Sequence, residues 1–422
     1  MTSGYRWVVV GLLWLVCVFN YADRQAIFSV FDPIKEEMAL TDVQLGVIGS
    51  AFMWVYAVTL VLGAWVGDWV NRKALIIGGL TFWSLVTLAT GFAENYWQLV
   101  VCRAVEGFGE AFYFPASMSM ISDYHGRRTR SRAMALHQSS VYAGTVLGGA
   151  VAGYCGQFYG WRTGFYLFGS AGVLLAVVLL LFLREPPRGA ADPDPAERPT
   201  APGDLLKGAR EVLTSPMALV LLGVFVGTVF VGSVFLAWTP TYLKREFGLS
   251  LSKSGVNATV WLQVGSVVGV VAGGWLADLW SRRRIGGRVL VMALGLFAGA
   301  PLLLAAGNAP SLVAFLVLLT AFGVCKGLYD SNTWASLYDV VSPGRRATAL
   351  GLVNGLGWLL GGASAPIVYA VAADTYGASA TLAAMSVIYL SAGGLLVAGS
   401  ALFLRRPAPA PLPTPTEEDQ SW

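Results

Sequence analysis

Charged residues are scarce in this chain of 422 residues, because Asp, Glu, Lys and Arg make up only 12% of it, against about 25% in average soluble proteins. Hydrophobic residues reach 56%, and the mean hydropathy is +0.63. This composition excludes an ordinary soluble protein and predicts an all-α membrane protein. The net charge is only +4 and no basic face is visible, so we expect no nucleic-acid partner.

Cysteine and histidine are also rare, with four and two residues. Each cysteine lies in an apolar run without a metal-ligand partner at the usual spacing, which favours small core residues over disulfides or zinc ligands. The sequence has no phosphate-binding glycine loop, nucleophile pattern or nucleotide domain. We therefore expect no metal, no cofactor, no enzymatic activity and no ATP drive. A polytopic membrane enzyme or a receptor remains the distant alternative.

Apolar runs long enough to cross a bilayer, about 20 residues each, divide the chain into twelve predicted transmembrane helices. Their approximate limits are 7–30, 43–66, 74–93, 96–121, 132–154, 161–183, 216–242, 252–276, 287–306, 310–335, 346–371 and 379–404. The first span has no small-residue cleavage site where a signal peptide would have one, so we expect it to be retained.

Basic residues are distributed unequally between the two sides of the predicted spans. Of the 28 Lys and Arg residues, twenty fall in segments on one side, five fall on the other side and three lie inside spans. By the positive-inside rule, both termini are cytoplasmic and the chain is a multi-pass protein of the cytoplasmic membrane.

One long interior break, residues 184–215, is rich in Pro, Ala and charge, and it separates the spans six and six. We predict an N-terminal six-helix bundle over 1–183, a cytoplasmic linker over 184–215 with a short surface helix near 205–212, a C-terminal bundle over 216–404 and a disordered tail over 405–422.

An internal repeat supports this division. GAWVGDWVNRK (63–73) follows the second span and GGWLADLWSRRR (273–284) follows the eighth, which places Asp68 and Asp278 210 residues apart, close to half the chain. A second pair, ISDYHGRRTRSRAMAL (121–136) and SLYDVVSPGRRATAL (336–350), follows the fourth and tenth spans. Matching loops in two six-helix halves are typical of a parallel repeat in transporters.

These loops resemble the major facilitator superfamily, and the resemblance covers all twelve spans. The pattern is a small residue, three further residues, an Asp and a basic cluster, although Ala64 stands where the family usually has Gly. The resemblance implies a gating role, in which the loops clamp helix ends when the inner gate is closed. The candidate gating residues are Asp68, Arg72, Asp278 and Arg282. Solvated turn residues are the alternative.

Two groups within the superfamily share further motifs with this chain. NYADR (20–24), RAVEGFGEA (103–111), YFPAS (113–117) and YGWR (159–162) resemble the anion:cation symporters, which carry sugar acids and sialic acid. NRKALIIGGLTFWSLVTL (71–88) and REPPRG (184–189) resemble the Spinster branch of proton-coupled lipid exporters. The resemblance therefore implies proton coupling more firmly than it implies a substrate.

Charges inside the spans are the strongest candidates for function, because an ionised side chain at mid-bilayer costs roughly 2.5–3.5 kcal/mol on insertion scales. Arg103, Glu106 and Glu110 share one helical face of the fourth span. At 1.5 Å per residue, Asp23, Arg24 and Arg103 lie at the outer-middle level, and Glu110 lies about 10 Å deeper, near the midplane. We expect Asp23 and Glu110 to carry protons and Arg24 and Arg103 to bind a carboxylate. A purely structural ion-pair network is the alternative.

Several other polar residues in the spans are candidates for lining a substrate cavity. Lys326 lies near the depth of Glu110 but is four residues from Asp330, so a local ion pair and a substrate contact are equally compatible with the sequence. His137 is either a proton relay or a packed, hydrogen-bonded histidine. The remaining candidate substrate contacts are Tyr21, Tyr56, Gln138 and Asn354.

The sequence thus predicts a monomeric secondary transporter that works by alternating access and moves a small organic anion, such as a sugar acid, together with protons. A Spinster-like, proton-coupled carrier of lysophospholipid or another lipid anion is the main alternative.

Overall fold

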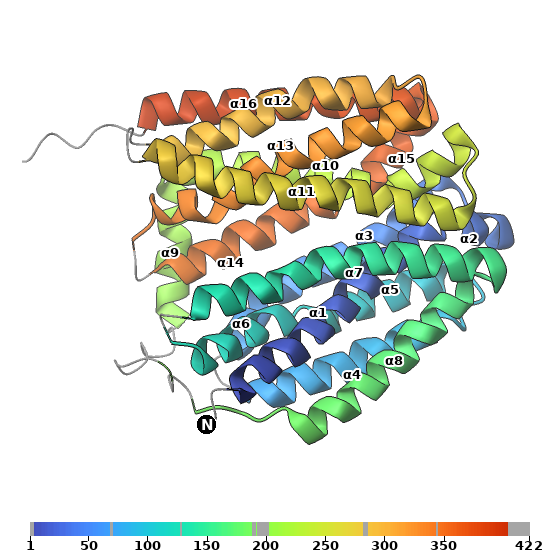
Figure 1. Ribbon diagram of the computed structural model, residues 1–422, viewed down its shortest axis with the longest axis horizontal. Helices are drawn as coiled ribbons and strands as arrows, with labels where there is room; N and C mark the ends of the chain where they lie inside the picture. The colour runs from blue at the N-terminus through green and yellow to red at the C-terminus, as the bar shows by residue number, and fades with distance from the viewer. Residues whose placement is uncertain are drawn as a thin grey trace, which may run out of the picture.

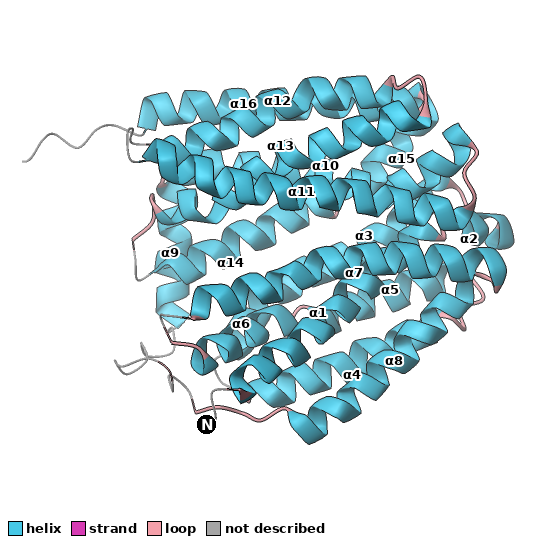
Figure 2. Cartoon of the chain, viewed as in Figure 1, coloured by secondary structure: helices cyan, strands magenta, loops and turns pink. Residues whose placement is uncertain are grey.

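The computed structural model describes residues 4–67, 71–126, 129–187, 191, 202–281, 286–342 and 345–403. Throughout these residues the chain forms helices joined by short loops, and no strand is present in them (Figure 2). Ten helices of the described chain are long and apolar enough to cross a membrane. The other two spans are a broken helix pair and a helix rich in glycine and polar residues, so the predicted twelve-helix fold is confirmed.

The first six spans begin and end close to their predicted limits. They are α1 (Tyr5–Ser29), α3 (Asp42–Gly67), α4 (Arg72–Thr90), α5 (Tyr96–Glu110) with α6 (Tyr113–Tyr124), α7 (Arg130–Phe158) and α8 (Trp161–Phe182). The second six are α10 (Pro216–Phe247), α11 (Leu251–Ser281), α12 (Gly287–Gly307), α13 (Leu312–Tyr338), α14 (Arg346–Leu356) with η2 (Gly357–Gly362) and α15 (Ala365–Tyr376), and α16 (Ala378–Phe403).

Two spans that the sequence predicts as continuous helices are interrupted. The fourth span is broken at Ala111–Phe112, and the eleventh widens into the π-helix η2 before Ala365. Proline explains both breaks, because its ring clashes with the carbonyl four residues earlier and it cannot donate to that carbonyl. Pro115 stands four residues after Ala111, and Pro366 stands four residues after Gly362. The first break directly follows Glu110.

Two short helices lie outside the spans. α2 (Phe31–Met38), which the span prediction does not include, buries Phe31, Asp32 and Ile34 and exposes Glu36 and Glu37. α9 (Pro202–Thr214) is the helix expected near 205–212 of the linker. It contacts the second half through Glu211, which accepts two hydrogen bonds from Ser342 and pairs with Arg345 at 2.8 Å. These bonds, with the Ser342 backbone N–H first, lower the pKa of Glu211.

The chain begins and ends its described spans at the same end of the molecule, beside α9 (Figure 1). We call this the terminal end and the opposite one the distal end. The ribbons of α7 and α11, one from each half, converge from the terminal toward the distal end (Figure 1). The distal parts of α7 and α11 are in direct contact, since a Cβ added at Gly255 would lie 2.2 Å from the Gly149 carbonyl oxygen. Glycine at these two positions therefore permits backbone contact between the halves.

A proline also links the halves near the distal end. Pro240, inside α10, cannot donate a hydrogen bond to the carbonyl of Leu236, which would otherwise remain unsatisfied within the helix. The side chain of Gln25 in α1 donates to this carbonyl at 2.9 Å. The backbone defect in one half is thus satisfied by a side chain of the other half.

Candidate functional site

The candidate site is a cluster of buried charges in the first half, which we call the central charge cluster. Its members come from three helices, α1, α4 and α5, and none is more than 6% exposed. They are Asp23, Arg24, Thr87, Arg103, Glu106 and Glu110. α5 presents its three charges on one face, as its sequence spacing predicts, and packs that face toward α1, α3 and α4.

Two ion pairs organise the cluster. Arg24 Nη2 donates to Glu110 Oε2 at 2.9 Å, which joins α1 to the end of α5. Arg103 Nη1 donates to Glu106 Oε2 at 2.5 Å within α5. The sequence estimate separates Arg24 and Glu110 in depth, but the arginine side chain is long enough to bridge that separation.

Aromatic rings of α1 and α3 surround the Arg24 guanidinium. Its Cζ lies 4.8 Å from the ring centre of Tyr21, 4.7 Å from that of Phe52 and 4.4 Å from that of Tyr56. Phe52 also lies 4.7 Å from Arg103 Cζ, so one ring separates the two cations. Aromatic faces attract cations and hold a planar guanidinium in place. Tyr21 and Tyr56, which the sequence predicts as substrate contacts, therefore lie beside the central charge cluster.

Asp23 is completely buried and is not in an ion pair with any described residue. Its Oδ2 is 3.4 Å from the Thr87 hydroxyl, and its Oδ1 has no hydrogen-bond partner in the described chain. The same hydroxyl is 3.3 Å from Glu106 Oε1. Asp23 and Arg103, which are expected at one level, therefore share no hydrogen bond or ion pair among the described residues, although they lie close enough to interact electrostatically.

Both arginines have buried N–H groups without a partner among the described residues. These are Nε and Nη1 of Arg24 and Nε and Nη2 of Arg103. A buried donor left unsatisfied costs free energy, and more so on a charged group. The site thus contains donors that a bound carboxylate could satisfy.

Other predicted contacts lie outside this cluster. Lys326 Nζ bonds to Asp330, so the local ion pair is formed, and Tyr142 of α7 lies within electrostatic range of both residues. Gln138 is exposed and Asn354 is half-buried. Among the described residues, none of these three predicted contacts forms a hydrogen bond or an ion pair with Arg24 or Glu110.

His137 is fully buried between helices of the first half and is hydrogen-bonded. Tyr113 donates its hydroxyl proton to the Leu13 carbonyl, so the bond of 2.8 Å between His137 Nε2 and Tyr113 requires the histidine to be the donor. This bond joins α7 to the start of α6, immediately after the break that follows Glu110.

The predicted gating residues are only partly described. Asp68 and Arg282 lie outside the described residues. Arg72 is buried and binds Asp123 of α6, Glu185 at 2.8 Å and the Pro186 carbonyl at 2.9 Å. Asp278 is exposed. Arg72 thus connects α4 to α6 and to the beginning of the linker at the terminal end.

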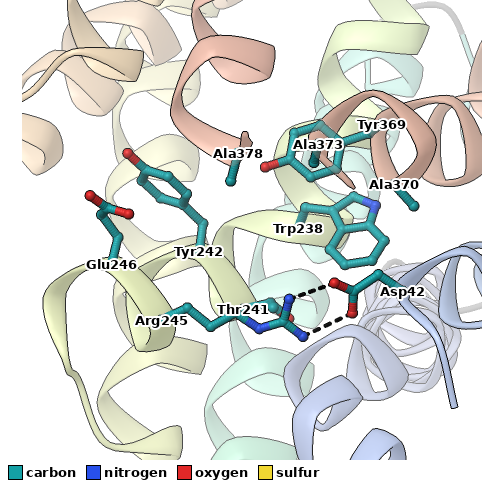
Figure 3. A pocket seen from close by; sticks show the side chains of 10 residues that line it. All are labelled: Asp42, Trp238, Thr241, Tyr242, Arg245, Glu246, Tyr369, Ala370, Ala373 and Ala378. Carbon is teal, nitrogen blue, oxygen red and sulfur yellow. Dashed lines mark hydrogen bonds and ion pairs between the residues drawn. The ribbon is translucent and has the colours of Figure 1, made fainter. Parts of the chain in front are cut away.

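A second group of charges, which sequence reasoning did not single out, joins the halves at the distal end. Arg245 of α10 donates to both carboxylate oxygens of Asp42 of α3, at 2.7 and 2.9 Å (Figure 3). It also donates to Asp32 of α2 at 2.8 Å. Lys244 adds a pair with Asp32 at 3.2 Å. Beside Arg245 lies a pocket of about 50 Å³ lined by Trp238 and other residues.

The distal ion pairs join residues about 200 positions apart in the sequence, so no local pattern predicts them. Phe52 and Thr87 also give no signal, because a phenylalanine or threonine in a transmembrane helix is ordinary. Glu106 is recognisable from its i, i+3 spacing to Arg103. Its partnership with Thr87 depends on the packing of α4 against α5.

Two six-span halves with buried charges inside the spans are typical of membrane transporters. The Major Facilitator Superfamily profile matches residues 13–287 and 258–421. The chain therefore belongs to the Major Facilitator Superfamily.

Curated relatives of this chain include two sugar-acid transporters and a Spinster protein. The chain is 29% identical to the D-galactonate transporter of Escherichia coli O6:H1 over 420 residues, covering 94% of this chain and 95% of that protein. It is 28% identical to the probable galactarate/D-glucarate transporter GarP of Escherichia coli K12, covering 79% and 81%. It is 29% identical to Protein spinster homolog 1 of Bos taurus, covering 89% and 74%.

The fold is similar to a crystal structure of a bacterial homolog of the human lysosomal transporter Spinster, in an inward-facing and unoccupied conformation. The TM-score is 0.85 with 24% identity, and the match covers 97% of this chain and 100% of that one. The expected superfamily, with relatives in both the sugar-acid and the Spinster groups, is confirmed.

Proposed function

We propose that this transporter is a proton-coupled symporter of a small organic anion, a sugar acid or another carboxylate, and that the central charge cluster binds the anion and the protons. The observation that carries the proposal is the composition of the cluster: two guanidinium groups with spare N–H donors stand among three buried carboxyl groups. The match to the D-galactonate transporter, which covers 95% of that protein, supports a small sugar acid over a lipid.

Arg24 and Arg103 are the proposed anion ligands. A guanidinium can donate two parallel hydrogen bonds to one carboxylate. Arg103 has such a pair unused in Nε and Nη2, whereas Arg24 has Nε and Nη1 unused and gains a parallel pair when Glu110 releases its Nη2. The rings of Phe52 and Tyr56 fix the Arg24 plane, so little side-chain freedom is lost on binding. Tyr21 completes this wall of the site. Lys326, Gln138 and Asn354 stay proposed contacts for a larger part of the substrate.

The charge count supports at least one bound proton. Guanidinium groups stay charged, so two arginines can balance two of the three carboxylates. Asp23 is the group left over, because it has no ion pair and one of its oxygens has no donor. An unpaired buried carboxylate is strongly unfavourable. We infer that Asp23 is protonated in this conformation.

Competition between the substrate carboxylate and Glu110 for Arg24 couples anion binding to proton binding. A substrate carboxylate that binds Arg24 displaces Glu110, and Glu110 must then take up a proton or remain a buried unpaired charge. Anion binding therefore favours proton binding, and by thermodynamic reciprocity the proton favours the anion. Pairing of Asp23 with an arginine in the outward-open state stays a prediction for that state.

The packed distal contacts support an inward-facing conformation in the alternating-access cycle. With the positive-inside rule, the terminal end is cytoplasmic, so both termini face the cytoplasm and the distal end faces outward. We propose that the protein works as a monomer in the cytoplasmic membrane. Asp68, Arg72, Asp278 and Arg282 would clamp the terminal end when it closes.

The proposed function is tested by uptake into proteoliposomes with an imposed pH gradient, acid outside. D-galactonate, D-glucarate and a lysophospholipid are compared in parallel. We expect one of the sugar acids to accumulate above its external concentration, and a protonophore to abolish the accumulation. Accumulation of the lysophospholipid alone would replace the proposal by the Spinster-like alternative. Absence of any effect of the gradient would remove proton coupling.

Lysine at either arginine position should bind the anion poorly. Arg24→Lys and Arg103→Lys keep the charge but lose the two-pronged donor, so we expect affinity to fall about 10- to 100-fold. Calorimetry with the accumulated anion measures this. Arg288→Lys, which alters a surface pair with Asp339, is the matched control and should bind like the parent. Unchanged affinity in both cluster variants would leave the arginines only a structural role.

Asp23→Asn should flatten the pH dependence of anion affinity. The parent should bind more tightly as pH falls, because protonation of the cluster and anion binding favour each other. The amide fixes position 23 in an uncharged form, so one titrating group is removed. Binding isotherms across a pH series give the slope. A slope as steep as the parent's would exclude Asp23 from the coupling.

A further inference from the structure

Thr87 differs from other threonines of its helix in what its hydroxyl contacts. Thr81 and Thr90 of α4 donate to carbonyls of their own helix, Ile77 at 2.8 Å and Val86 at 3.0 Å. This is the usual behaviour of threonine in a helix. The Thr87 hydroxyl instead reaches out of α4 and lies between two carboxyl groups, those of Asp23 on α1 and Glu106 on α5. It is 1% exposed.

A hydroxyl between two carboxyl groups is informative because it has one proton and two acceptor lone pairs. It can donate to one carboxylate only. To bond with both groups, it must accept from the second, which is possible only if that second group carries a proton. Glu106 is already paired with Arg103 at 2.5 Å, which favours its ionised form. The donor to Thr87 must then be Asp23.

We propose that Thr87 is a positioning residue for proton coupling, which forms a directional chain from protonated Asp23 through the Thr87 hydroxyl to Glu106 and Arg103. This inference rests on the proposed function, in which Asp23 binds a coupling proton. When Asp23 releases its proton, two carboxylates compete for a single hydroxyl proton, and one of them loses its bond. Thr87 thereby transmits the protonation state of α1 to the arginine pair of α5.

The chain predicts the sign of the effect of removing the hydroxyl. With Asp23 protonated, Thr87 takes part in two hydrogen bonds; with Asp23 ionised, it makes one. The hydroxyl therefore favours protonated Asp23 by one neutral hydrogen bond. Among the described residues, the charged groups that act on Asp23 are Glu106, Glu110 and Arg103, all from α5. These three charged groups are unchanged in a Thr87 variant. Any change in the titration of Asp23 is therefore caused by loss of the Thr87 hydroxyl.

The test is a pH titration of the purified full-length protein by infrared difference spectroscopy, which needs no substrate. A protonated carboxyl group gives a carbonyl-stretch band. The band that is present in the parent and absent in Asp23→Asn is assigned to Asp23. In Thr87→Val, which keeps the shape of the side chain, we expect the midpoint of this band to fall by about half to one pH unit. Thr87→Ser should restore it, and Thr90→Val, which removes a buried hydroxyl bonded to its own helix, should leave it unchanged.

The outcomes separate this inference from the proposed function. A midpoint that rises in Thr87→Val would mean that Thr87 only donates to ionised Asp23, and the chain would be refuted. An unchanged midpoint would refute it as well. If no band depends on Asp23 at any pH, Asp23 carries no proton and the inference fails, while proton coupling through Glu110 is tested separately by Glu110→Gln. Thr87→Ala, which is smaller, serves the same comparison if the valine variant does not fold.

Discussion

Glu110→Gln is expected to abolish the accumulation of anion driven by a pH gradient while leaving anion exchange intact. Glutamine mimics the protonated carboxyl, so Arg24 loses its ionic partner at 2.9 Å and becomes available to the substrate permanently. Anion binding then no longer requires a proton, so the pH gradient cannot drive anion accumulation. The measurement compares gradient-driven uptake with exchange of labelled for unlabelled anion in the same proteoliposomes.

Glu94→Gln is the matched control for this variant. Glu94 is an exposed residue just before α5, so its substitution changes the same chemical group without touching the cluster. It should behave like the parent in both assays. A Glu110→Gln protein that still concentrates the anion under a proton gradient would show that Glu110 is not the coupling group, whatever the other carboxyls do.

Gly255→Ala is expected to reduce transport strongly by preventing closure of the distal end. The added Cβ would lie 2.2 Å from the backbone oxygen of Gly149, and a backbone atom cannot move away as a flexible side chain can. Overpacking costs about 1–3 kcal/mol, which shifts the balance toward the distal-open state about 5- to 150-fold. Uptake should fall accordingly.

Spin labels at the distal ends of α7 and α11 test whether the distal end opens. Cysteines at Tyr159, which directly follows α7, and at Lys253 of α11 allow the distal separation to be measured in the parent and in Gly255→Ala, in a background without the four native cysteines. We expect a longer distance in the variant. Gly394→Ala, where an added Cβ meets no atom within 4 Å, should leave both distance and uptake unchanged. If Gly255→Ala keeps the parent's distance and uptake, the contact between Gly149 and Gly255 has no role in closing the distal end.

Composition and periodicity are sufficient to predict the twelve spans, because each span must satisfy its backbone within the bilayer as a long apolar helix. They do not predict the breaks in the fourth and eleventh spans, although Pro115 and Pro366 carry that information. The hydropathy of a span is insensitive to one proline. The break after Glu110 follows from local backbone chemistry instead.

The charged members of the candidate site could be predicted from the sequence because charges are rare in spans and costly there. Their pairing could not. Depth estimates from the sequence place Asp23 at the level of the arginines. In the structure Arg24 pairs with Glu110, and the hydrogen-bond partner of Asp23 is Thr87. Side-chain length and helix rotation decide such pairings. The same reason explains why the ion pairs of Arg245 with Asp32 and Asp42 emerge only from the packed structure.

The central claim is that the anion and protons cross the membrane together through the central charge cluster. The most direct measurement uses proteoliposomes that contain a trapped pH indicator, with equal pH on both sides and D-galactonate or D-glucarate added outside. We expect the transported sugar acid to acidify the lumen as it enters, and Glu110→Gln to admit it without acidification. Entry into parent proteoliposomes without any change of lumenal pH, or with alkalinisation, would contradict proton symport through the cluster.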